Sequence, residues 1–207
     1  MSKTEKSLLK SFVVFVLLVA IGVVVTIWYQ QRTATTAEAY SVDPGPTPKK
    51  QNNLQETSVN SSNADKKLIL RTTRKSGGMT EYAYYLADIS GANERLLFDK
   101  TLPAGASMAL PVNSWDPTDT YVFLEEHNSG AVDFLVLKIS GEPFADGNKY
   151  IDVGAVWANK NIGYAIRTAT GWASGTLLII YTSKDDGSRG PAFWFEIPST
   201  AILQLAS

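Results

Sequence analysis

Few residues of this 207-residue sequence could do chemistry, and His127 is its only histidine. Glu125 and Glu126 precede it, and Asn128-Ser129-Gly130 follows it. A catalytic triad needs a nucleophile, a base and an orienting acid within hydrogen-bond reach, and the sequence has no Gly-x-Ser-x-Gly nucleophile elbow. The segment is also typical of a β-hairpin tip. We therefore expect His127 to be a solvated turn residue and the protein not to be an enzyme.

Metal and cofactor sites have little support in the sequence. It contains no cysteine, and a single histidine cannot form a multi-histidine metal site. Acidic clusters could offer oxygen ligands to calcium, but none has the spacing of an EF-hand loop, and tight turns use the same residue types. No glycine-rich segment has the Lys-Ser/Thr of a phosphate-binding loop. We predict no metal and no cofactor. The acidic clusters lie at 116–119, 146–148 and 185–188.

The charge of the chain argues against nucleic acid as a partner. Nineteen Lys and Arg residues face twenty Asp and Glu residues, which gives a net charge of -1 at pH 7. Such a chain has no overall positive field that would attract phosphate backbones.

Aromatic residues are numerous and follow a strand-like pattern. Tyr82 and Tyr84 are two positions apart, as are Phe193 and Phe195, so each pair shares one face of a strand. Two interpretations are open: core packing between sheets, or a platform on which a glycan or peptide stacks. The candidate binding aromatics are Tyr85, Trp157 and Trp194.

Residues 11–31 contain no charge and predict a transmembrane helix. The apolar core of this segment, Phe12–Trp28, rises about 26 Å as a helix, and its weakly polar flanks complete the crossing of a hydrocarbon core of about 30 Å. The alternative is a cleaved signal peptide, because Ala37-Glu38-Ala39 has the form of a cleavage site.

The charges around this segment predict its orientation. Lys3, Lys6 and Lys10 precede it, and only Arg32 follows it closely. The positive-inside rule then keeps residues 1–10 in the cytoplasm and places the rest of the chain outside the cell membrane. We expect a single-pass membrane protein with an extracytoplasmic C-terminal domain.

A change of composition divides the exported part in two. Residues 32–65 are rich in Thr, Ser, Asn, Gln and Pro without a periodic apolar pattern, and they predict a disordered linker. Residues 66–207 contain short runs of β-branched and aromatic residues separated by turn residues, which is typical of antiparallel strands. We therefore predict an all-β domain over 66–207.

This domain contains three similar units, 68–91, 121–141 and 177–199. Each unit has two strands around a glycine-containing turn and ends in a small polar corner: ADISG, LKISG and FEIPS. The corners are about 50 to 58 positions apart, roughly the length of one four-stranded propeller blade. A tryptophan corner precedes the second unit and, in degraded form, the third. Its residues are Trp115, Asp116, Pro117 and Asp119 in the second unit, and Trp172 and Gly175 in the third.

The pattern resembles the blades of the TolB-type and dipeptidyl-peptidase-IV-N-terminal-type β-propellers, the PD40 or WD40-like group. The resemblance covers about 67–207 and implies a propeller of antiparallel blades. Thr120 departs from the glycine of that family's W-S-P-D-G corner. Three units are also fewer than the ~4–8 blades of a closed propeller. The domain is then an open fragment, a propeller completed by another chain, or a three-sheet β-domain whose resemblance is convergent.

Together these observations predict a membrane-anchored, non-catalytic module that binds protein or glycan at the cell envelope. The alternative, which the resemblance implies, is an accessory or regulatory domain of an envelope peptidase or hydrolase carried by another chain. Because three blades leave sheet edges uncovered, we also expect a homo-oligomer or a partner that completes the propeller.

Overall fold

The computed structural model describes residues 54–206, which lie within one compact unit of the chain. The predicted cytoplasmic segment (1–10), the predicted transmembrane helix (11–31) and most of the predicted linker lie outside the described residues. Among the described residues, no helix has both the length and the apolar character needed to cross a membrane. The described part is predominantly β-strand, as predicted, with one short α-helix.

Three antiparallel four-stranded sheets make up the described unit, and each uses four strands that are consecutive in the sequence. Short connections favour this arrangement, because a tight turn can join only antiparallel neighbours. A 3₁₀ turn, η1 (Ser76–Gly78), joins the second and third strands, and helix α2 (Val153–Asn159) follows the eighth. The strands are, in sheet A, β1 (Leu54–Asn60), β2 (Lys66–Arg74), β3 (Thr80–Asp88) and β4 (Arg95–Leu102); in sheet B, β5 (Ala106–Ala109), β6 (Tyr121–Asn128), β7 (Ala131–Lys138) and β8 (Tyr150–Asp152); and in sheet C, β9 (Ala165–Ser174), β10 (Leu177–Ser183), β11 (Arg189–Glu196) and β12 (Ala201–Gln204).

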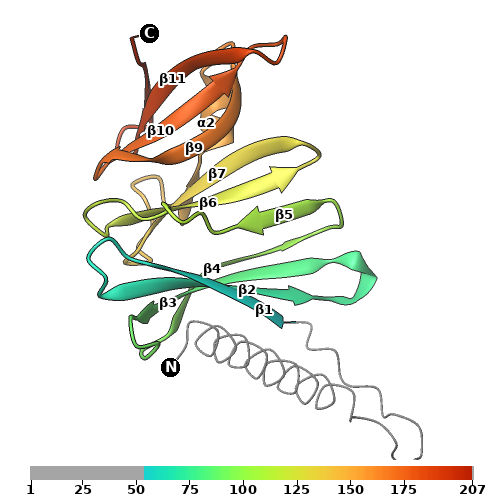
Figure 1. Ribbon diagram of the computed structural model, residues 1–207, viewed down its shortest axis with the longest axis vertical. Coiled ribbons are helices and arrows are strands. Elements are labelled where there is room, and N and C mark those ends of the chain that lie inside the picture. Colours follow the sequence, from blue (N-terminus) through green and yellow to red (C-terminus); the bar gives the residue numbers. More distant parts are fainter. Residues whose placement is uncertain (1–53, 207) are drawn as a thin grey trace, which may run out of the picture. The chain divides into compact units, whose positions relative to one another are not determined.

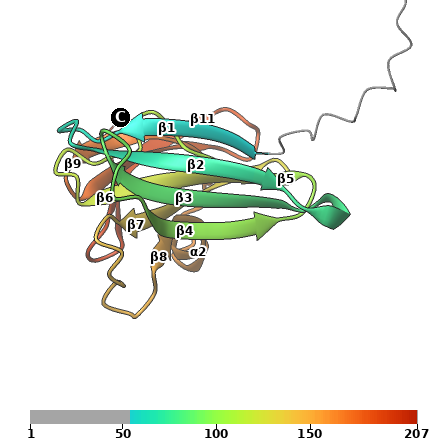
Figure 2. The same cartoon turned by 90° about the horizontal axis from the view of Figure 1, so that it is seen from below.

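The sheets are stacked face to face, with sheet B between sheets A and C (Figure 1). The view from below shows β1 to β4 side by side across sheet A, with β1 and β4 at its two edges (Figure 2). Each sheet therefore has two edge strands within the described unit, because none of the sheets closes into a barrel.

Sheet B is buried on both faces because each of its central strands contains an unbroken apolar run, 121–124 in β6 and 134–137 in β7. Val122 and Leu124 of β6 belong to the core between sheets A and B, whereas Phe123 between them belongs to the core between sheets B and C. In β7, Leu135 and Val136 divide in the same way. Successive side chains of a strand point to opposite faces, so an unbroken apolar run supplies two cores at once.

The outer sheets turn their paired aromatic residues toward sheet B, as the spacing of these residues predicts. Tyr82 and Tyr84 of β3 are buried in the core between sheets A and B. Phe193 and Phe195 of β11 are buried in the core between sheets B and C. Tyr85 and Trp194 take the opposite faces and are only half-buried.

Strand β1 corrects the predicted domain boundary. Composition predicts a disordered linker over 54–65, but Leu54–Asn60 pairs along its whole length with β2. Its sequence, LQETSVN, is mostly polar because it is an edge strand, and Val59 is its only residue that packs on the core. Pairing with β2, rather than burial of apolar side chains, holds this segment as a strand.

Candidate functional site

The corner at Trp115 is a buried junction that contacts both neighbouring sheets. Trp115 is 6% exposed, and its indole N–H donates to the main-chain carbonyl of Val59 in sheet A, 3.3 Å away. The indole N–H of Trp172 in sheet C donates to the carbonyl of Ser114, at 3.0 Å. Two tryptophan side chains therefore link the segment before β6 to the strands on either side.

Asp116 organises the turn of this corner. Its side chain is fully buried, and its carboxylate accepts hydrogen bonds from the main-chain N–H groups of Thr118, Thr120 and Tyr121 at 2.8, 2.6 and 2.7 Å. The Thr118 hydroxyl also contacts it. Since both oxygens are occupied by donors of the protein, Asp116 is a structural residue here rather than a free metal ligand.

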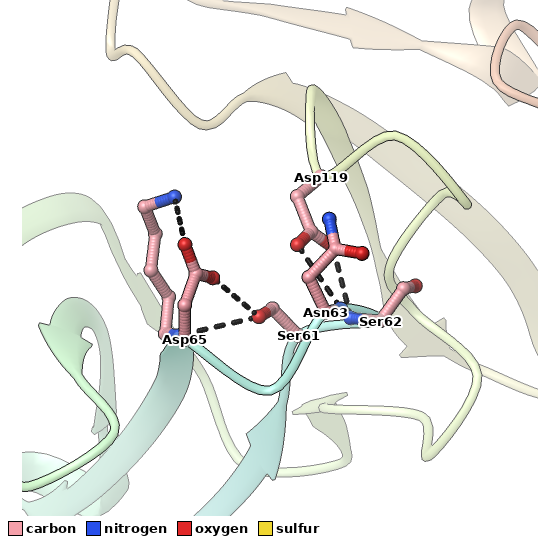
Figure 3. A network of polar contacts seen from close by, with 6 residues as sticks. Ser61, Ser62, Asn63, Asp65 and Asp119 are labelled. Atoms are coloured by element: carbon pink, nitrogen blue, oxygen red, sulfur yellow. Dashed lines mark hydrogen bonds and ion pairs between the residues drawn. The ribbon is translucent and has the colours of Figure 1, made fainter.

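Asp119 fastens the corner to the turn between β1 and β2 (Figure 3). Its two carboxylate oxygens accept from the main-chain N–H groups of Ser62 and Asn63, at 2.8 and 3.3 Å. The Ser62 hydroxyl donates in return to the carbonyl of Asp116, at 2.9 Å. Asp119 adopts a φ of 54°, in the left-handed region that Asp tolerates better than most residues.

Residues 61–65 are themselves held by a local hydrogen bond. The Ser61 hydroxyl donates to Asp65 at 3.0 Å, and this bond lowers the pKa of the Asp65 carboxyl, with a further contribution from Lys66. On the other side of the corner, Gly175 in the β9–β10 hairpin approaches so closely that a Cβ there would lie 3.0 Å from the Thr118 side chain. Pro117 is exposed at the same corner.

A groove with a volume of about 440 Å³ lies between sheets A and B, on the side of edge strands β1 and β5. The sheet A wall has hydroxyl and amide side chains, and the sheet B wall is apolar. None of the lining residues is charged. The lining residues are Gln55, Thr57, Ser58, Val59, Leu70 and Thr72 on one side, and Met108, Ala109, Leu110 and Val112 on the other.

The Trp115 corner positions one wall of this groove. Val59 lines the groove and also accepts the Trp115 N–H at its carbonyl, so the corner holds the C-terminal part of β1 against sheet B. Nearby, the Tyr84 hydroxyl donates to the carbonyl of Ala109 in β5, at 3.1 Å. Val112, 87% exposed, offers an apolar side chain to solvent.

A second concavity, of about 350 Å³, surrounds the start of β7, and three carboxylates and one lysine are among its lining residues. Lys100 and Glu126 form an ion pair across it at 2.5 Å. Asp133 accepts the N–H of Gly154 at 2.6 Å, while Asp152 accepts that of Ala155 at 2.7 Å, so both carboxylates hold the first turn of α2. Burial raises the pKa of Asp133 to about 6, and the nearby Asp152 carboxylate adds to this effect, while the N–H bonds from Phe134 and Gly154 oppose it.

These carboxylates already have hydrogen-bond or ion-pair partners within the protein. Within residues 54–206, no group of three or more His, Cys, Asp or Glu side chains is arranged to hold a metal ion. The other acidic clusters form turns: Asp146 and Asp186 accept from Asn148 and Ser188 two positions ahead, and these bonds lower their pKa values.

His127 lies in strand β6, opposite Val132, and not in the turn where the sequence predicted it. The turn consists of Ser129 and Gly130, whose φ angles of 50° and 85° fit a two-residue hairpin. The imidazole Nε2 contacts Glu125 at 2.6 Å, two positions away on the same face of the strand.

The three candidate binding aromatics have different surroundings. Trp157 is buried, because it lies in helix α2 and packs on Phe193; its N–H donates to the carbonyl of Tyr164 at 2.8 Å. It is a core residue rather than a surface platform. Tyr85 is covered by the Arg71 guanidinium, 4.8 Å from its ring centroid. Trp194 lies on the outer face of sheet C.

The sequence pattern did not reveal the groove. Its sheet A wall comes largely from β1, which composition had assigned to the linker. The alternation of Gln55, Thr57 and Val59 opposite Leu70 and Thr72 becomes visible only once β1 is paired with β2. A search of protein-family models and a search of curated protein sequences gave no match to this chain.

Proposed function

We propose that this chain is a membrane-anchored, extracytoplasmic, β-propeller-like module that binds an extended polypeptide segment without catalysis. The observation that supports it best is the groove between β1 and β5. Both flanking strands are sheet edges, and an edge strand offers a row of main-chain donors and acceptors to an added segment.

The chemistry of the groove walls favours a particular ligand. An uncharged segment with alternating apolar and hydroxyl side chains would match them, because successive residues of an extended chain face opposite sides. A charged side chain would lose hydration there without gaining an opposite charge. A glycan is a weaker match, because no aromatic side chain lines the groove for sugar stacking.

The propeller-like part of the proposal rests on the resemblance of the sequence repeats. The three four-stranded antiparallel sheets, each made of consecutive strands, are compatible with three blades. The membrane anchor rests on residues 11–31 and the lysines that precede them.

The test uses a peptide library displayed on phage, selected against the full chain purified in detergent. We expect enriched peptides to be uncharged and alternating, and to bind in the micromolar range. Thr57→Lys and Val112→Glu, both at exposed positions, should weaken binding at least tenfold, because each places a charge in the groove.

The matched control is Ile89→Glu, which adds the same charge at an exposed apolar residue outside the groove lining. It should leave binding unchanged, as should His127→Ala. Failure to enrich any peptide, or enriched peptides that bind both groove variants normally, would show that the groove is not the binding site.

A further inference from the structure

The outer face of sheet C carries a continuous apolar row. Ile179, Trp194 and Leu203 are direct cross-strand neighbours on β10, β11 and β12. Tyr181 lies two residues beyond Ile179 on the same face. We call these four residues the sheet C patch. Their sequence neighbours on β10 and β11 point the other way, into the core shared with sheet B.

The sheet C patch differs from the two apolar faces of sheet B in what covers it. Sheet B has two such faces, and each is covered by a neighbouring sheet. Sheet C ends the stack, and no other sheet of the described part lies beyond it (Figure 1). Leu203 is 49% exposed, although it is a large apolar residue.

Charges of opposite sign flank the patch at the two ends of β11. The Arg189 guanidinium lies over the Tyr181 ring, 5.3 Å from its centroid. Glu196, seven residues later, accepts from the N–H and hydroxyl of Ser199 through a single oxygen, Oε2. At about 3.3 Å per residue, the two charges are about 23 Å apart along the strand.

We infer that two copies of this chain pair through the sheet C patch around a two-fold axis that passes near Ala192 of β11. An axis that runs across the strands at this level sets the two β11 strands antiparallel, so that Arg189 of each copy meets Glu196 of the other. Trp194 then packs beside the partner's Tyr181, which lies at the level of Ala192. A two-fold interface requires a surface that complements itself, and a patch with opposite charges at equal distances from its centre does so. Tyr, Trp and Arg are also the residue types that dominate interface energies.

The outer face of sheet A fits a partner less well. Its arginine, Arg71, is already paired with Glu56 at 2.8 Å and with Glu94 at 2.5 Å. Among residues 54–206, no comparable pair of opposite charges without an ion-pair partner flanks Tyr85. The charges therefore favour sheet C against sheet C over a head-to-tail contact of sheet C with sheet A.

Sedimentation of the full chain in detergent tests the pairing, because it measures the mass of the particle. The protein concentration is varied over about 1–50 μM, the range in which such contacts form. We expect a dimer that dissociates on dilution. Trp194→Glu and, independently, Leu203→Glu at the exposed edge strand should raise the dimer dissociation constant at least tenfold. Val112→Glu, in the groove, should not change it, which separates this inference from the proposed function. A monomer throughout, or a dimer that withstands both variants, would overturn the pairing.

Charge exchange tests the geometry. Arg189→Glu and Glu196→Arg should each weaken the dimer, because both place like charges together at two positions. The double variant should restore it, because the exchanged charges meet again across the axis. If the double variant is as weak as the single ones, the two residues do not face each other.

The absence of cysteine allows a direct measurement of the axis. Ala192→Cys should be joined to its own copy by a bifunctional thiol crosslinker that spans about 10 Å, the separation of two facing sheets, since a residue close to a two-fold axis lies near its own copy. Ala131→Cys, at an exposed hairpin position of sheet B, is the matched control and should remain uncrosslinked. Crosslinking of the control alone would place the interface elsewhere.

Discussion

The indole N–H of Trp115 donates to the main-chain carbonyl of Val59, 3.3 Å away, and so joins sheet B to the first strand of sheet A. Val59 also lines the groove between the two sheets. The same tryptophan thus stabilises the core and sets the position of a strand that forms the candidate binding site. Packing and site geometry can be separated by the choice of substitution.

Trp115→Ala should lower the free energy of unfolding by about 3–5 kcal/mol, the cost of removing a large buried aromatic side chain. Trp115→Phe keeps most of the ring and loses the N–H, so we expect a loss of about 1–2 kcal/mol together with weaker peptide binding. Urea unfolding of the full chain measures the free energy of unfolding of both variants, and binding of a selected peptide is measured separately. An unchanged midpoint for Trp115→Ala would show that the corner does not contribute to the core.

The two aspartates of the corner should differ in importance. Asp116→Asn places an amide among main-chain N–H donors in a fully buried site, and we expect a loss of about 3 kcal/mol. Asp119→Asn, which is partly exposed and keeps one acceptor for the β1–β2 turn, should cost about 0.5–1 kcal/mol. Thermal unfolding of both variants decides the order; a larger loss for Asp119→Asn would contradict it.

Much of the fold could be predicted from local patterns. The alternation of Tyr82, Tyr84 and Tyr85 correctly assigned faces of a strand, because side chains alternate whatever the tertiary context. Val59 shows the limit of this approach: one apolar residue in a polar strand has no period, and only its pairing with Leu68 of β2 reveals its role.

The candidate site was less predictable because its residues come from distant segments. Trp157 is an example: the sequence made it a candidate binding aromatic, but Asp152 accepts the N–H of Ala155 and starts a short helix that turns the indole into the core. Asp152 is a favoured helix N-cap residue, but a helix of seven residues is too short to give a clear periodic signal.

The orientation of the chain in the membrane can be tested independently of the fold. Lys3, Lys6 and Lys10 predict a cytoplasmic N-terminus and an exported β-domain. Protease added to intact cells should then remove the domain that begins at β1. If the domain is cut only after lysis, the predicted orientation is wrong.

The final prediction concerns pH. The pKa of Asp133 is raised from 3.8 to about 6, chiefly by burial and also by the Asp152 carboxylate, so the folded state binds this proton more tightly than the unfolded state does. The resulting stabilisation is complete below about pH 3.8 and is lost as the pH rises through about 6.

Asp133→Asn, which resembles the protonated acid, should remove this dependence and raise stability at pH 7.5 by about 1 kcal/mol, a small value because solvent screens the partly exposed carboxyl. The control, Asp146→Asn, removes a carboxyl whose pKa is lowered by Asn148, so it should leave the slope between pH 4 and 6 in place (the window set by these pKa values). Chemical unfolding across this window measures both variants, and a wild-type slope that survives in Asp133→Asn would assign the proton to another group.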